Sequence, residues 1–176
     1  MLRSINVGGR NRVAMADLCA IADSLGYGDV STYVQSGNLV FTGSGSPAEV
    51  GRSIEERIAS DLGLTVPVVV RTKLQLGRVL RENPFALPEL DAKTVHVTFL
   101  TDRADADKVA RLQERAGQFG KDRFEVIGSH VYLHCPGGYG VTKLNNSYLE
   151  GHLGVTATTR NWRTVTTLAS MTKQLR

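Results

Sequence analysis

The chain opens with the stretch around which its fold is arranged: Arg3-Ser4-Ile5-Asn6-Val7-Gly8-Gly9-Arg10-Asn11-Arg12-Val13. Apolar and polar residues alternate over 2–7, which predicts a strand with Ile5 and Val7 on one face. The two glycines then predict a tight loop. After the loop, apolar residues recur at helical spacing and Gly26 follows as the expected C-terminal cap; these residues are Met15, Leu18, Cys19, Ala22 and Leu25.

The following segments complete a β-α-β-β-α-β order. Runs of β-forming residues over 30–35 and 38–42 predict a hairpin. A capping box at Ser46 begins a second helix, which Gly63 ends. A further strand is predicted over 66–71. This order of elements is typical of a ferredoxin-like half.

The same order then begins again after a helical connector. Strands are predicted over 94–100, 123–127, 130–135 and, weakly, 155–158, and helices at the apolar positions of 109–119, 144–149 and 165–175. We therefore predict an α+β fold: a tandem pair of ferredoxin-like halves with antiparallel sheets and extra connecting and C-terminal helices. The expected domains are 1–71, a connector over 72–93, and 94–176. A single larger α/β sheet is the alternative.

Composition narrows the class of protein. The 176 residues are 41% hydrophobic, so a core can form, and the formal net charge of +4 permits contact with phosphates without demanding nucleic acid. Cys19 and Cys135 lie far apart and form no CxxC pair, which favours a reducing compartment. No apolar run is as long as a membrane span, and no signal peptide is recognisable. We expect a soluble cytoplasmic protein.

The expected topology places two polar turns together. In a ferredoxin-like sheet the first two strands run parallel, so the loop after the first strand lies beside the turn between the second and third strands. The two turns would form one rim of the sheet, near the N-terminus of the first helix. Unpaired backbone N–H groups at such a helix end favour the binding of an anion. The alternative is that both are merely good turn sequences with solvated arginines.

We predict a ligand-binding site at this rim. Arg10 and Arg12 would supply charge, the amides of Asn6, Gln35 and Asn38 would orient the ligand, and the glycines would give it access to the backbone. The full set of predicted ligand-binding residues, two of them in the second half, is Asn6, Gly8, Gly9, Arg10, Arg12, Gln35, Ser36, Gly37, Asn38, Lys143 and Arg160.

Two further polar clusters occur in the second half. The glycine-rich segment 136–143 precedes a helix but lacks the spacing of a Walker A loop, so it is either a backbone nest with Lys143 or a flexible connector. The segment 158–163 joins two arginines to Trp162. Arg–Trp stacking with a cap from Asn161 explains it structurally, and an exposed version would suit a nucleotide.

The sequence gives little support for a metal site, a nucleophile or RNA recognition. His130 and His134 share a strand face without further metal ligands, and Cys135 is better explained as a small buried hydrophobe than as a nucleophile. No Gly-x-Ser-x-Gly elbow occurs. The acidic residues at 102–107 suit a helix start, and the strands lack the aromatic pattern of RNA-recognition domains. The sequence predicts no metal site, names no catalytic residue or cofactor, and leaves open whether the protein is an enzyme.

Four motifs together resemble a known family. They are Arg3-x-Ile5-Asn6-Val7-Gly8-Gly9, Tyr33-Val34-Gln35-Ser36-Gly37-Asn38, Glu82-Asn83-Pro84-Phe85 and Ala157-Thr158-Thr159-Arg160-Asn161-Trp162. The chain is similar to the bacterial domain of unknown function (DUF) 1697 family, and the motifs run from one end of the chain to the other. The resemblance implies a tandem ferredoxin-like fold in a cytosolic bacterial protein, and no activity.

The chain departs from the family pattern at three places. Ser4 stands where Gly is usual, and Ala14 where Pro is usual. Val141-Thr142 replaces a more basic, serine-bearing pair before Lys143, which weakens a phosphate-loop interpretation of that segment.

Three functions follow as hypotheses. The leading one is binding of a small anionic ligand, a phosphorylated molecule or a nucleotide, at the rim. The second is a nucleic-acid-binding module that uses Arg3, Arg10, Arg12, Lys143, Arg160 and Arg163, with affinity that falls steeply with salt. The third is a structural role, in which the uncovered sheet faces pair the halves or form a homodimer.

Overall fold

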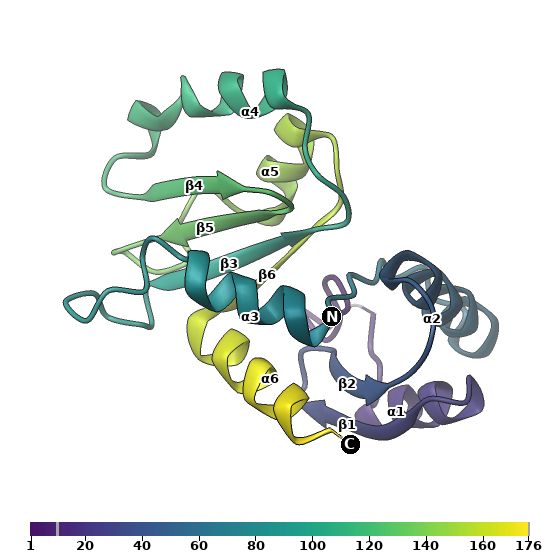
Figure 1. The fold of residues 1–176 in the computed structure, drawn as a ribbon. Helices are drawn as coiled ribbons and strands as arrows, with labels where there is room; N and C mark the ends of the chain where they lie inside the picture. The colour runs from purple at the N-terminus through teal and green to yellow at the C-terminus, as the bar shows by residue number, and fades with distance from the viewer. Residues whose placement is uncertain (10, 176) are drawn as a thin grey trace. The chain divides into compact units, whose positions relative to one another are not determined.

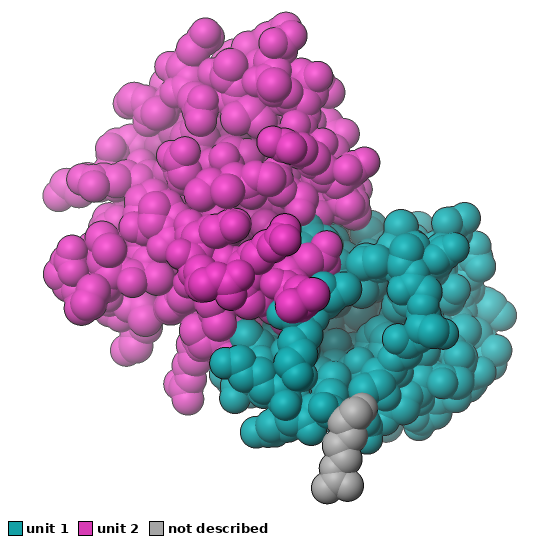
Figure 2. Space-filling model, in the orientation of Figure 1, with its two compact units in different colours: residues 1–73, 167–176 teal, residues 74–166 magenta. Residues whose placement is uncertain are grey.

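The computed structural model describes residues 1–9 and 11–175. The chain divides into two compact units, shown in Figure 2: unit 1 is Met1–Lys73 with Thr167–Arg176, and unit 2 is Leu74–Thr166. The domain boundaries expected from the sequence, after residues 71 and 93, stay predictions. The C-terminal residues from Thr167 group with unit 1. The physical reason is that Thr172 and Leu175 line one pocket with Phe41 of that unit.

Unit 1 is built on a hairpin with two helices. Strands β1 (Gly28–Tyr33) and β2 (Asn38–Thr42) pair antiparallel, with α1 (Met15–Ser24) packed on them and α2 (Pro47–Leu62) packed on α1 (Figure 1). The core is formed by apolar side chains from both helices and from the segments before α1 and after α2: Leu2, Ile5, Val13, Leu18, Ile21, Val50, Ile54, Ile58, Val66 and Val68.

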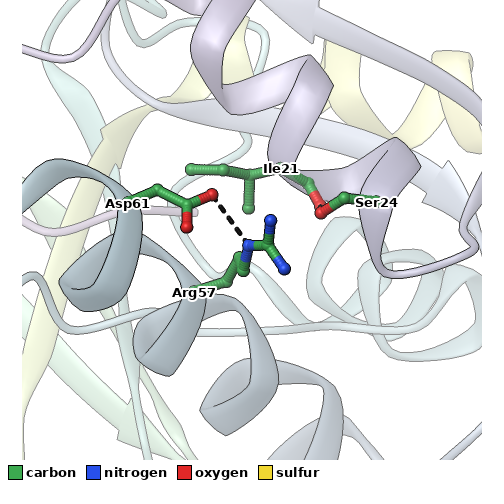
Figure 3. A network of polar contacts seen from close by, with 4 residues as sticks. All are labelled: Ile21, Ser24, Arg57 and Asp61. Carbon is green, nitrogen blue, oxygen red and sulfur yellow. Dashed lines mark hydrogen bonds and ion pairs between the residues drawn. The ribbon is translucent and has the colours of Figure 1, made fainter.

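The ends of α2 follow the predicted local signals. Ser46 Oγ accepts from the Glu49 amide at 3.3 Å, and Glu49 Oε2 accepts from the Ser46 amide at 2.8 Å, which completes the capping box. Gly63 ends the helix in the left-handed conformation. On the surface of α2, Arg57 Nε donates to Asp61 Oδ2 at 2.7 Å, one turn along the helix (Figure 3). An exposed pair of this kind adds little to stability.

The two outer strands predicted for this half are largely absent. The predicted strands over 2–7 and 66–71 meet only in one antiparallel bridge, between Leu2 and Val68. Left-handed backbone at Ser4 (φ 53°) and Asn6 (φ 55°) interrupts the pleat. Ile5 is consequently 2% exposed while Val7 is 65% exposed, so the prediction that they share a face is wrong. Two hydrogen bonds still flank the bridge, from Arg3 N to Pro67 O and from Val69 N to Met1 O, both 2.9 Å.

Unit 2 contains a four-stranded antiparallel sheet. Its order is β4 (Arg123–Ile127), β5 (His130–His134), β3 (Val95–Leu100) and β6 (Ala157–Asn161). Counted within the unit this is 2-3-1-4, the strand order of a ferredoxin-like sheet. Helices α4 (Ala106–Gln113) and α5 (Asn146–Leu153) cover one face, where their leucines pack with Leu100, Val131, Leu133 and Ala157.

Some boundaries in unit 2 differ from the prediction. The helix expected over 109–119 is divided into α4 and a 3-10 turn, Ala116–Phe119, after which Gly120 takes a positive φ of 63°. Strand β6 begins and ends later than predicted, where it pairs with β3, and Asn161, its last residue, also caps the next helix. Asn161 Oδ1 accepts from Thr164 N at 2.8 Å, which confirms the predicted cap.

Two helices cross the division between the units. They are α3 (Lys73–Glu82) and α6 (Trp162–Gln174). The described residues thus form a mixed α+β fold with six α-helices and separate antiparallel sheets, which excludes the single larger sheet. None of the helices in the described residues combines the length and apolar character needed to cross a membrane.

Candidate functional site

The first loop is fastened to the hairpin turn by one side chain. Asn6 Nδ2 donates to the carbonyl oxygens of Gln35 and Val13, at 2.9 Å in both cases, and Asn6 Oδ1 accepts from Val13 N at 3.0 Å. The two turns therefore lie side by side, as the topology predicted. Both donors and one acceptor position of the Asn6 amide are engaged within the protein, so this residue shapes the site.

Gly37 provides a second link between the same segments. Its carbonyl accepts from Leu2 N at 2.9 Å. A Cβ at this position would lie 2.7 Å from Ile5 Cδ1 and 2.8 Å from Leu2 Cβ, and the φ of 74° is left-handed. The structure thus uses glycine here for a close buried approach to the core.

Ser36 and Asn38 close the turn itself. Asn38 is fully buried, and its Nδ2 donates to Tyr33 O at 3.0 Å and to Ser36 Oγ at 2.9 Å. These contacts fix the start of β2. The structure therefore gives Asn38 a structural contact set inside the turn, away from solvent.

An open pocket of about 560 Å³ lies where the loop, the turn and the start of α1 meet. Its lining is Asn6, Gly9, Arg12, Val13, Ala14, Asp17 and Gln35. Four of these are predicted site residues. Asp17 was missed, although an acidic residue in the first turn of a helix was a visible signal. Arg10 lies outside the described residues.

The start of α1 shapes the electrostatics of this pocket. Ala14 is the N-cap residue and has no side chain that can accept from the first-turn amides. Unpaired amides and the positive end of the helix dipole favour an anion there, and the exposed Arg12 adds a full positive charge. Asp17 contributes the opposite charge on the next part of the wall.

The segments around the pocket carry unusual backbone. Ser4, Asn6, Asn11 and Val34 all have positive φ, as do Gly8 and Gly9. Val34, at φ 52°, is the least favourable of these residues, because a β-branched side chain clashes with the backbone in the left-handed region. It is also 52% exposed, so core packing does not offset the strain. Strain of this kind concentrates at functional sites.

Arg160 belongs to a separate polar network in unit 2. Its Nη1 donates to Thr158 Oγ1 and Thr159 O, both at 2.9 Å, and burial lowers the pKa of its guanidinium to about 10. The Thr159 hydroxyl lies 2.7 Å from Thr98 Oγ1 and donates to Asn146 Oδ1 at 2.7 Å. Arg160 and Lys143 are not among the lining residues of the pocket in unit 1.

The glycine-rich segment 136–143 is bound into the same unit. Tyr139 stacks on His96 with ring centroids 4.9 Å apart, and burial raises the pKa of its hydroxyl. Thr142 Oγ1 donates to Asp122 Oδ2 at 2.6 Å and accepts from Leu144 N at 3.1 Å. These contacts give the segment a structural explanation within unit 2.

Cys135 and the strand histidines also have structural surroundings. Cys135 is fully buried, and burial raises the pKa of its thiol to about 11, so the thiolate required of a nucleophile is disfavoured. His130 packs edge-on to Phe99 at 5.5 Å, and His134 lies 6.0 Å from the Phe85 ring. Within the described residues, no group of three or more potential ligands is placed to hold a metal ion.

The predicted nucleic-acid and homodimer partners, and the cytoplasmic location, stay predictions.

No curated protein matches the chain. Among solved structures, the chain is similar to the conserved bacterial protein SP0830 from Streptococcus pneumoniae, with 23% sequence identity and a TM-score of 0.73. That match covers 98% of this chain and 96% of the other, and at this identity it supports the fold alone.

A family model described as a protein of unknown function, DUF1697, matches residues 1–132. The match includes the first loop, the hairpin turn and α3, and it ends within β5, before the motif over 157–162. Because the matched residues make up most of the sequence, the chain belongs to the DUF1697 family.

Proposed function

We propose that the protein binds a small anionic ligand, a phosphorylated molecule or a nucleotide, in the pocket between the first loop and the hairpin turn. The observation that carries this proposal is the pairing of exposed Arg12 with an uncapped helix start in one pocket. Both features attract an anion, and they do so by independent means, a guanidinium and a set of backbone amides.

The composition of the pocket narrows the class of ligand. Asp17 repels a bare anion from its part of the wall and accepts hydrogen bonds instead. A suitable ligand therefore carries a phosphate or carboxylate at one end and hydroxyl or N–H donors at the other. Sugar phosphates and nucleotides have this arrangement. The Gln35 side chain, exposed on the same wall, can serve either donors or acceptors.

The lining residues of the pocket favour ligand binding over catalysis. Among the lining residues that the structure describes, Arg12 and Asp17 are the ionisable ones, and no hydroxyl or thiol nucleophile accompanies them. A carboxylate without a positioned nucleophile does not define a catalytic arrangement. The proposal therefore assigns no chemical step to this pocket.

A thermal-shift comparison tests the proposal. Wild type is screened with AMP, glucose 6-phosphate and inorganic phosphate, and with adenosine and glucose as uncharged partners. A binding ligand at a hundredfold excess over its Kd adds about 2.7 kcal/mol to stability. We expect the phosphorylated compounds to raise Tm, the uncharged partners to fail, and Arg12→Gln to abolish the response.

The control is Arg52→Gln, which removes an exposed arginine of α2 that does not line the pocket. It should respond as wild type does. The assignment fails if no phosphorylated compound stabilises wild type, or if Arg12→Gln and Arg52→Gln respond alike. Asp17→Asn distinguishes the contacts of the two ends of the ligand. It should strengthen the binding of inorganic phosphate relative to the binding of AMP.

The proposal extends to the architecture of unit 1. We interpret it as a ferredoxin-like half whose outer strands are reduced to bridges. Support comes from Leu2, which bonds to Gly37 on one side and pairs with Val68 on the other. The order of segments is then 66–71, 1–7, β2 and β1, which corresponds to the sheet order of a complete ferredoxin-like half. Amide exchange tests it: the Leu2 and Val69 amides should exchange as slowly as those of β2.

A further inference from the structure

A second pocket of unit 1 has a different character. It holds about 360 Å³, within the usual range for small-molecule sites of about 300–1,000 Å³. Its walls come from the end of β2, the start of α2, the segment 70–73, the last turn of α6 and Leu175 after it. None of its lining residues lines the first pocket, so the two are separate.

The charged groups of this pocket have one sign. Arg71 and Lys73 both line it, and no acidic side chain does so among the lining residues that the structure describes. Arg71 is half-buried, and burial lowers the pKa of its guanidinium to about 10, so it still carries its charge at neutral pH. Its Nη1 also donates to Val70 O at 2.8 Å, which holds the side chain along its own backbone segment.

Much of the remaining wall is apolar. Phe41, Val50, Val70 and Leu175 contribute aromatic and aliphatic surface, and Phe41 is fixed by stacking on Tyr27 with ring centroids 4.5 Å apart. Threonine hydroxyls at the edge, including Thr72, add neutral hydrogen-bonding groups. An apolar group that covers this wall is stabilised, because its binding removes apolar surface from water.

Two residues at the edge of the pocket have close contacts with their neighbours. Gly43 lies under the Tyr27 ring, where a Cβ would come within 2.8 Å of Tyr27 Cδ1. Glu49, the nearest acid in sequence to the α2 wall, turns its carboxylate back onto Ser46, at 2.8 Å from the amide and 2.7 Å from Oγ. The capping box thus holds the Glu49 carboxylate at Ser46, and Arg71 and Lys73 are the charged side chains among the lining residues that the structure describes.

We propose that this pocket binds a small amphipathic acid, a carboxylate with an aromatic or branched aliphatic body. The acid group accepts hydrogen bonds from Arg71 and Lys73, and the body covers the wall formed by Phe41, Val70 and Leu175. A free phosphate or a sugar phosphate fits this pocket poorly, because it leaves that apolar wall uncovered.

A matched series of three compounds tests the proposal. 3-Phenylpropionate, 3-phenylpropanol and 3-phenylpropylamine share one apolar body and differ only in the charge of the head group. The full-length chain is titrated with each and followed by amide chemical shifts. We expect the acid to bind about tenfold or more tightly than the alcohol, as a charge-assisted hydrogen bond implies, and the amine to bind least. The shifts should concentrate at Gly43, Val70 and Thr72.

Two exposed lysines provide the matched variants. Lys73→Glu reverses a charge in the pocket, and Lys173→Glu makes the same change on α6 at a residue that does not line it. Lys73→Glu should weaken the binding of the acid about tenfold and leave the affinity for the alcohol unchanged. Lys173→Glu should change neither affinity. Arg71→Gln is a further variant, judged only if its far-ultraviolet spectrum and Tm match wild type.

The result is independent of the first pocket, because Arg12→Gln should leave the response to phenylpropionate intact. Equal binding of the acid and the amine overturns the proposal, as does equal weakening by Lys73→Glu and Lys173→Glu. Inorganic phosphate that reproduces the same shifts at the same concentration overturns it too, since the site would then select charge without the apolar body.

Discussion

Asn6 reaches Gln35 across 29 positions of the sequence, and its Nδ2 donates to the Gln35 carbonyl oxygen at 2.9 Å. The same amide group bonds twice to the backbone of Val13. One side chain thus joins the start of the first loop, its end, and the hairpin turn. The candidate pocket, which Asn6 also lines, is therefore shaped by this amide.

The first prediction concerns that amide. Asn6→Asp keeps an acceptor for Val13 N but loses both donors and points a carboxylate at two carbonyl oxygens. We expect it to lower the free energy of unfolding by about 1–3 kcal/mol, as measured by urea denaturation. Gln35→Ala is the control, because only the Gln35 backbone takes part. Equal effects of the two substitutions would contradict the assigned bond.

The second prediction separates two uses of glycine in the same region. Gly37→Ala places a methyl group 2.7 Å from Ile5 Cδ1 at a left-handed φ, and should cost about 2–4 kcal/mol of stability. Gly9→Ala has a similar φ of 76° but nothing within 4 Å of the new carbon, and should cost only about 1 kcal/mol. Thermal and chemical unfolding of both variants would measure the difference, and a larger effect at Gly9 would contradict this account.

The elements that could be predicted from the sequence are those with local causes. The capping box at Ser46 and the glycine stop at Gly63 act within one turn of their helix, so their residues alone define them. The strand predicted over 2–7 depends on something else. Its interruption at Asn6 reflects hydrogen bonds to distant residues, which no local periodicity reports.

The candidate site likewise combines features that the sequence predicted with features that it did not. The adjacency of the two turns followed from topology, and Arg12 from its place after the loop. Asp17 was not predicted for the pocket, because an acidic residue in the first turn of a helix has an ordinary local explanation. The second pocket combines Phe41, Arg71 and Leu175, which are far apart in sequence, and only the folded chain brings them together.

The third prediction concerns strain beside the candidate pocket. Val34 adopts a φ of 52° with its side chain largely in solvent, so Val34→Asn should relieve strain without loss of packing. We expect the variant to gain about 1 kcal/mol in the free energy of unfolding. Val7→Asn is the matched control: Val7 is more exposed than Val34 but has no positive φ, and should gain nothing. A gain at Val7 as large as at Val34 would show that relief of surface hydrophobicity is the cause.

The fourth prediction is a pH dependence in unit 2. Burial lowers the pKa of His96 from its usual 6.5, although the Thr94 carbonyl 3.3 Å from Nδ1 acts in the opposite direction. Below pH 6.5 the unfolded chain therefore takes up a proton that the folded chain resists, and stability falls as the pH falls. His96→Phe keeps a ring beside Tyr139 and removes this titration. Urea denaturation at several pH values should show wild type losing more stability than His96→Phe between about pH 7 and pH 5. Parallel losses in the two proteins would mean that the His96 ring is protonated as readily in the folded chain as in the unfolded one.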